Sequence, residues 1–156
     1  MKKYLQKKLN NEKGMTLIEL LAVIVIIAII AAIAIPAIGN IIENSRVGTM
    51  KSDNLNAIAA AELYLLDNPT ETEVELTDIA GSPAAGSVAA VAGQYMDDRG
   101  SLTSFTYKKA DKTVVSAAEQ GTMNLNIVSP GATKAQINNY ANSSRVAAGG
   151  ITASKD

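Results

Sequence analysis

The residues whose types and spacing suit chemistry lie near the start of this 156-residue chain, at the beginning of a long apolar run. Gly14 precedes Met15, and a small side chain placed directly before such a run indicates a site where a leader is cut. Glu19 places one carboxylate inside the apolar segment. A carboxylate at the centre of a membrane helix costs about 2.5 to 3.5 kcal/mol and usually has a partner. Glu19 lies close to the helix start, where the helix dipole favours negative charge.

The element that carries these residues is a helix of membrane length. From Leu20 to Ile38 the sequence contains no charged or polar side chain. At ~1.5 Å per residue these nineteen residues span about 28 Å, close to the ~30 Å hydrocarbon core of a bilayer. The stretch therefore predicts a transmembrane helix that starts next to the cleavage site.

This arrangement resembles the start of a type IV prepilin. The features that carry the resemblance are Gly14 before Met15-Thr16-Leu17-Ile18-Glu19, an apolar helix that contains Pro36, and a short Lys-rich leader. The resemblance implies cleavage after Gly14 by a prepilin peptidase, N-methylation of the new amine at Met15, and Glu19 as the fifth residue of the mature chain. Met15 is a departure, since the family most often has Phe there. The resemblance covers residues 13–50.

Two other interpretations of the N-terminus are a secretory signal peptide and a plain single-span anchor. Ala32-Ile33-Ala34 resembles a signal-peptide cleavage site. However, the apolar run is longer than the roughly 7 to 15 residues of such a peptide, and Pro36 would lie just after the cut. The prepilin leader explains more of the pattern than either alternative.

The charge of the leader, residues 1–14, predicts how the chain crosses the membrane. The whole chain has 14 basic and 15 acidic side chains, and the leader holds five lysines and one glutamate. Nine basic and fourteen acidic residues therefore remain after cleavage, which gives a formal charge of −5. Basic residues favour the cytoplasmic side, which leaves the leader inside and exports the C-terminal part. The acidic mature chain disfavours nucleic-acid binding, because such binding depends on neutralising phosphates.

Cysteine and histidine are both absent from the sequence. Many type IV pilins resemble one another in having a disulfide near the C-terminus, so this head has to rely on its core alone. The two absences also remove thiolate and imidazole metal ligands and a histidine general base. The sequence has no phosphate-binding loop and no nucleophile-elbow motif. We expect no catalytic residue, no metal site and no cofactor.

The second half of the long helix is predicted over residues 40–69. Asn68-Pro69 ends it, because the residue before proline is biased away from the helical conformation. Apolar residues recur at three- to five-residue intervals with polar residues between them, which is typical of an amphipathic helix. They are Ile41, Ile42, Val47, Met50, Leu55, Ile58, Leu65 and Leu66.

Residues 15–39 form the predicted membrane-spanning and filament-core half of the helix. Pro36 removes one backbone hydrogen bond there, and Gly39 is a weak helix former. The family resemblance implies that this part of the helix loses hydrogen bonds and extends when subunits pack into a filament. The alternative is a harmless kink, since membrane helices often accommodate proline.

Residues 70–156 are predicted to form a small globular head with an αβ-loop, a three- to four-stranded antiparallel sheet and a C-terminal region. The loop is expected to contain a short helix from Ser87 to Met96. Ser129-Pro130-Gly131 is interpreted as the end of the meander, followed by a short helix over Thr133 to Asn142 and by an edge strand or a loose tail at 147–152. Three segments predict the meander itself: Leu102 to Lys108, Thr113 to Ala117 and Thr122 to Val128.

The fold class we expect is α+β, with a long N-terminal helix packed on a small antiparallel sheet. The resemblance implies a structural subunit, the major pilin, that waits in the cytoplasmic membrane and then joins a surface filament. Its expected partners are copies of itself in a helical homopolymer, the prepilin peptidase, the pilus assembly platform with its ATPase, and the membrane before assembly. The methylated amine of Met15 is expected to neutralise Glu19 of an adjacent subunit. The alternatives are a minor pilin or a pseudopilin of a secretion or DNA-uptake machine, and a monomeric membrane-tethered binding module.

Overall fold

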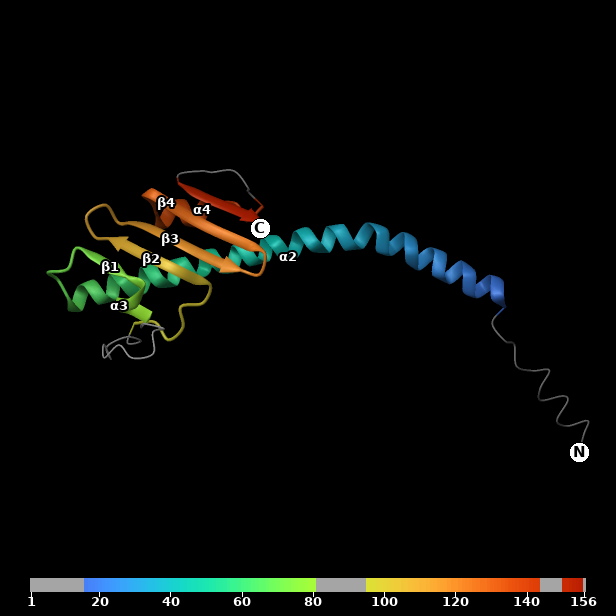
Figure 1. The fold of residues 1–156 in the computed structure, drawn as a ribbon, viewed down its shortest axis with the longest axis horizontal. Coiled ribbons are helices and arrows are strands. Elements are labelled where there is room, and N and C mark those ends of the chain that lie inside the picture. Colours follow the sequence, from blue (N-terminus) through green and yellow to red (C-terminus); the bar gives the residue numbers. More distant parts are fainter. Residues whose placement is uncertain (1–15, 81–94, 144–149, 156) are drawn as a thin grey trace, which may run out of the picture. The chain divides into compact units, whose positions relative to one another are not determined.

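The computed structural model describes residues 16–80, 95–143 and 150–155. Its longest element is helix α2, which runs without interruption over Leu17–Asp67 (Figure 1). The helix ends directly before Asn68-Pro69, as the sequence predicts. By its internal contacts the chain divides into two compact units, residues 1–40 and residues 41–156.

The described part of the first unit is the apolar half of α2. Every large hydrophobic side chain from Leu17 to Ile38 is exposed, between 48% and 90% of its surface. This helix is long and apolar enough to cross a membrane. Exposed apolar side chains over this length favour contact with lipid or with another protein.

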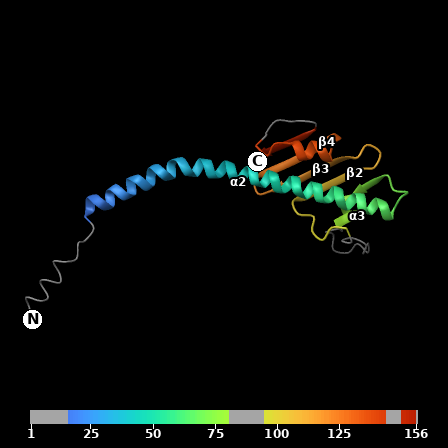
Figure 2. The same ribbon diagram turned by 180° about the vertical axis from the view of Figure 1, so that it is seen from behind.

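The second unit contains a five-stranded antiparallel sheet in which the strands follow one another in sequence order (Figures 1 and 2). Helix α3 (Leu76–Ala80) follows the first strand, and helix α4 (Lys134–Asn139) follows the fourth. The strands are β1 (Glu73–Glu75), β2 (Leu102–Lys108), β3 (Thr113–Gln120), β4 (Met123–Thr133) and β5 (Ile151–Lys155). The long helix and the antiparallel sheet together confirm the predicted α+β class.

The number of strands was underestimated, because the two edge strands are short. The sequence pattern missed β1, which has one buried residue, Val74, between two exposed glutamates. Pairing with β2 stabilises it, including an ion pair in which Lys108 Nζ lies 3.6 Å from Glu73 Oε1. The edge-strand alternative for the C-terminal tail is correct, since Ile151 to Lys155 pair with β4.

The interpretation of Ser129-Pro130-Gly131 as the end of the meander was wrong. Strand β4 continues through these residues to Thr133, and its register against β3 shifts between Val114 and Ser116, whose partners are Ala132 and Ile127. Gly131 has φ +100°, and a Cβ there would lie 2.9 Å from the carbonyl oxygen of Val114. Proline and glycine therefore form an irregularity inside the strand instead of ending it.

The remaining boundaries shift by a few residues. Strand β2 has the predicted bounds, β3 extends three residues past Ala117, and the last helix is shorter than predicted. Thr133 is the N-cap of α4 and forms a reciprocal capping box with Gln136, which explains where that helix starts. The predicted helix from Ser87 to Met96 falls almost wholly outside the described residues.

The core lies between the second half of α2 and one face of the sheet. The predicted alternation in the sheet is confirmed, since Phe105 with Tyr107, and Met123 with Leu125 and Ile127, are all buried. The predicted helix face was only partly right. Ile41, Ile42 and Leu66 are exposed, whereas the buried helix residues are Val47, Met50, Asn54, Ala57, Ile58, Ala60, Ala61 and Leu65. Alanines occupy much of the contact because a small side chain lets the helix backbone approach the sheet closely.

Polar contacts from the second half of α2 fix it against the rest of the head. Asn54 is fully buried, donates from Nδ2 to the Met50 carbonyl oxygen at 2.9 Å, and accepts a hydrogen bond from Ser116 Oγ. Asp53 accepts from the backbone N–H of Ser101 at 2.8 Å. Lys51 Nζ donates to carbonyl oxygens at the end of α4, including that of Asn138 at 3.2 Å. These contacts hold one register of helix against sheet.

Candidate functional site

The described start of the site is a reciprocal cap at the first turn of α2. The backbone N–H and the hydroxyl of Thr16 both donate to Glu19 Oε2 at 2.8 Å, and the backbone N–H of Glu19 donates to Thr16 Oγ1 at 3.3 Å. This is a capping box, in which the first residue and the one three positions later satisfy each other's free N–H groups. Glu19 therefore has a hydrogen-bonding role within its own chain.

The sequence carries a signal for this cap that is separate from the predicted roles of Glu19 as a charge near the helix dipole and as a partner for Met15. Thr16-Leu17-Ile18-Glu19 has the threonine-to-glutamate spacing of a capping box directly before an apolar run. Gly14 and Met15, the predicted cleavage and methylation residues, lie outside the described residues.

Pro36 and Gly39, the predicted break, lie inside α2, and the helix continues through both. Proline has no N–H, so the carbonyl of Ala32 has no intrahelical donor at that turn. Around Gly39 an added Cβ would meet nothing within 4 Å, so packing in the single chain does not require glycine there. The proposed loss of helical structure concerns an assembled state and stays a proposal.

A stripe of uncharged side chains runs along the outward face of the second half of α2, with the exposed Glu62 beside it and the exposed Asp67 just past its end. Its exposed side chains recur at alternating intervals of four and three residues, so they lie along one side of the helix. They are Ser45, Thr49, Ser52, Asn56, Ala59, Leu63 and Leu66. Thr49 Oγ1 donates to the Ser45 carbonyl oxygen at 3.2 Å, which satisfies its hydroxyl within the helix. A solvent-facing helix surface normally carries charges, so this uncharged stripe suits contact with another surface.

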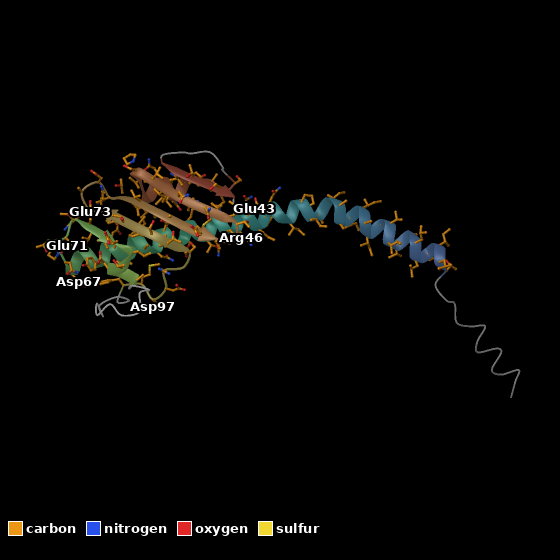
Figure 3. The ribbon with its side chains drawn as sticks, in the orientation of Figure 1. Glu43, Arg46, Asp67, Glu71, Glu73 and Asp97 are labelled. Atoms are coloured by element: carbon orange, nitrogen blue, oxygen red, sulfur yellow. The ribbon has the colours of Figure 1, made fainter. Side chains whose placement is uncertain are left out.

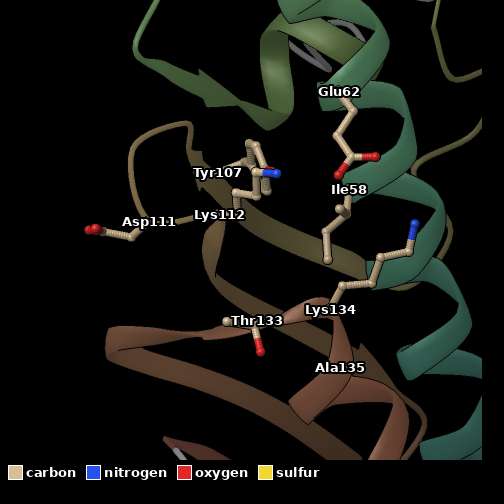
Figure 4. A pocket seen from close by; sticks show the side chains of 8 residues that line it. All are labelled: Ile58, Glu62, Tyr107, Asp111, Lys112, Thr133, Lys134 and Ala135. Atoms are coloured by element: carbon tan, nitrogen blue, oxygen red, sulfur yellow. The ribbon is translucent and has the colours of Figure 1, made fainter.

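The head also contains a cavity of about 360 Å³, shown in Figure 4. Its lining residues come from α2, from β2 and the β2–β3 turn, and from the end of β4 with the start of α4: Ile58, Glu62, Tyr107, Asp111, Lys112, Thr133, Lys134 and Ala135. Burial raises the pKa of Tyr107, and Glu62 raises it further through its charge and a hydrogen bond. The volume lies at the lower end of the roughly 300 to 1,000 Å³ range of ligand pockets. Two lysines and two acidic residues line it, so their formal charges balance.

The start of the chain matches a known protein family model. Residues 9–35 match the family model of the prokaryotic N-terminal methylation motif. The chain carries the leader signature of type IV prepilins. No curated protein and no solved structure matches the chain.

The prepilin signature supports a type IV pilin-like or pseudopilin protein. It points to a structural protein of the pilin type and not to an enzyme. The signature implies processing by a prepilin peptidase and handling by a pilus-type assembly machinery. Together with the apolar half of α2, it supports a precursor anchored in the membrane.

Proposed function

We propose that the chain is the structural subunit, specifically the major pilin, of a type IV pilus, and that it polymerises through α2 into a surface filament. The observation that carries this proposal is the pairing of a prepilin leader signature with an apolar half-helix whose large side chains are all exposed. Lipid can cover these side chains before assembly, and the helices of neighbouring subunits can cover them afterwards.

The uncharged stripe on the second half of α2 supports the same packing. It faces away from the sheet and begins where the apolar half ends. Serine, threonine and alanine side chains let helices approach closely, and the leucines at its far end add apolar area. A subunit that remained monomeric would gain nothing from leaving this face without charge.

Charge can then determine the register between subunits. Moving apolar side chains from lipid to neighbouring helices is nearly balanced in free energy, because lipid tails are as apolar as leucine. We propose that cleavage between Gly14 and Met15 exposes an amine, that this amine is methylated, and that it pairs with Glu19 of an adjacent subunit. In a low-dielectric filament core, either charge alone is strongly disfavoured relative to the pair.

In this proposal Pro36 and Gly39 mark the segment of α2 that extends when subunits assemble. Because the helix already lacks one hydrogen bond at Pro36 and glycine favours the helix weakly, this segment requires the least free energy to extend. Extension there would let the head and the filament core adjust to each other during packing. A helical backbone at both residues in an assembled filament would contradict it.

Electron microscopy of sheared surface material, with peptide identification, tests the main proposal. We expect filaments in which this chain is the most abundant protein and in which the first residue is methyl-Met15. A chain present in trace amounts would instead be a minor pilin or a pseudopilin. A chain that stays in the membrane as a monomer, with no filament material, would favour the tethered binding module.

A further inference from the structure

The cavity shown in Figure 4 has an apolar floor and a charged rim. Ile58 of α2 and Tyr107 of β2 form the floor, and both are almost fully buried. Glu62, Lys112 and Lys134 contribute to the rim, and their side chains are exposed. All five residues belong to the unit of residues 41–156. The cavity therefore suits a ligand that carries an apolar body and a charged group.

Two other lysines, Lys108 and Lys109, precede the cavity residues in the β2–β3 hairpin and have acceptors within the protein. Lys108 Nζ lies 3.6 Å from Glu73 Oε1, and Lys109 Nζ donates to the Pro69 carbonyl oxygen at 2.8 Å. Figure 3 shows Glu73 near Glu71, at the end of the head where β1 begins. These two lysines therefore hold β1 and the end of α2 to the hairpin.

Lys112 and Lys134 have no such acceptors. In the ranges that the structure describes, neither residue makes a hydrogen bond or an ion pair. Figure 4 shows both side chains extending toward α2, whereas Asp111 points away from the cavity. Glu62 faces the cavity, and the Tyr107 hydroxyl donates a hydrogen bond to its carboxylate. Among these described residues the cavity thus faces two unpaired ammonium groups and one carboxylate that already has a partner.

The backbone of Lys112 is strained. Its φ of +52° lies in the left-handed region, which glycine and asparagine adopt more readily than a lysine does. Strained backbone of this kind is enriched at ligand sites, where the side chain is needed in one place. A lysine that is held in this conformation, at the rim of a cavity and without an acceptor, indicates a role for its ammonium group.

We infer that the cavity binds a small carboxylate with an apolar body. The carboxylate lies between the ammonium groups of Lys112 and Lys134, and the apolar body covers Ile58 and the ring of Tyr107. A volume of about 360 Å³ admits a body of the size of an aromatic ring. The site lies within one unit of the chain and does not depend on polymerisation, so it can hold or fail independently of the proposed filament.

Fluorine NMR of 4-fluorobenzoate tests this inference on the full chain in a nonionic detergent. We expect saturable broadening of the fluorine signal when the protein is added. 4-Fluorobenzylamine has a ring of the same size with the opposite charge, and it should show no saturable broadening. No saturable binding of the benzoate, or equal binding of the amine, would overturn the inference.

Three variants separate the site from the stability of the fold. Lys112→Asn and Lys134→Gln should each weaken benzoate binding about tenfold or more, because each removes a charge-assisted hydrogen bond. Lys112→Asn should also keep or raise the thermal midpoint measured by circular dichroism, since asparagine tolerates the left-handed conformation. Lys109→Asn, which removes a lysine of the same hairpin that does not line the cavity, should bind like wild type. Unchanged binding in both Lys112→Asn and Lys134→Gln would contradict the assignment.

Discussion

Thr16 and Glu19 cap each other at the first turn of α2, with Thr16 N and Oγ1 each 2.8 Å from the same carboxylate oxygen of Glu19. The carboxylate thus serves its own helix in the single chain, and in the proposed filament it would also face the amine of a neighbour. The two roles depend on different properties of the side chain. Capping needs an oxygen acceptor, which glutamine also supplies, whereas pairing needs the negative charge.

The first prediction separates these roles. We expect Glu19→Gln and Glu19→Ala precursors to insert and to be cleaved normally, yet to form few or no filaments when expressed alone. Removing one partner of a buried charge pair costs about 3 to 5 kcal/mol at each interface. Filaments are counted by electron microscopy, with the substitution confirmed in the filament protein.

Thr16→Val is the control for this prediction, because it removes the capping hydroxyl and keeps the charge. It should weaken the helix start by about 0.5 to 2 kcal/mol and still allow filaments. Normal filament numbers in Glu19→Gln would sink the pairing hypothesis. Loss of filaments in Thr16→Val, with Glu19→Gln unaffected, would assign the function of Glu19 to capping alone.

The second prediction concerns processing. Because Gly14 supplies the small side chain before the apolar run, Gly14→Ala should be processed poorly and a bulky residue there should block cleavage. Intact-mass measurement of the wild-type surface form should give a chain that starts at methyl-Met15. A leader still attached, or a start near Ile35, would contradict the prepilin processing.

The third prediction concerns the head as an independent unit. A chain of residues 41–156 removes the membrane half and keeps the part of α2 that covers the sheet. We expect it to be soluble, monomeric and cooperatively folded without metal or reducing agent. Thermal unfolding by circular dichroism and sedimentation measure this, and aggregation or the lack of a transition would show that the boundary or the core is wrong.

The fourth prediction tests the buried polar pair between α2 and β3. Asn54→Ala leaves the hydroxyl of Ser116 buried without its acceptor and should lower the free energy of unfolding of the head by about 1 to 3 kcal/mol. Asn56→Ala is the matched control, since Asn56 lies on the exposed side of the same helix. It should change the free energy of unfolding by less than about 0.5 kcal/mol. Equal effects in chemical denaturation would show that Asn54 contributes through helix propensity only.

The fifth prediction concerns alkaline pH. Burial and Glu62 raise the pKa of Tyr107 above its ordinary value of 10.0, so the folded head holds this proton more tightly than the unfolded chain. The contribution of Tyr107 to the free energy of unfolding is therefore complete below pH 10.0 and is lost as the pH rises through the folded-state pKa. Burial lowers the pKa of Lys51, and this shift changes the free energy of unfolding with pH in the opposite direction. Because Lys51 is present in both wild type and variant, its effect cancels in the comparison. Between about pH 8 and about pH 11, Tyr107→Phe should lose less unfolding free energy than wild type. An equal or larger loss in the variant would contradict this assignment.

Local patterns predicted the parts of the protein whose structure depends on neighbouring residues in the chain. The apolar run, the end of α2 at Asn68-Pro69 and the bounds of β2 follow from hydrophobicity, from the steric effect of proline and from alternation. The prepilin leader could likewise be recognised from the Lys-rich start, from Gly14 to Glu19 and from the apolar run, because this signature lies in one contiguous segment, residues 9–35.

Tertiary structure decided the features that depend on contacts between distant residues. Val74 belongs to a strand only because β2 lies beside it, and β4 continues through Pro130 and Gly131 because β3 accommodates an irregular register. Asn54 is buried although it is polar, since Ser116 supplies its partner from across the core. Leu66 is exposed although it fits the apolar spacing, because the sheet does not cover that side of α2. Periodicity places residues on a face of a helix, but only the packed sheet determines which face is buried.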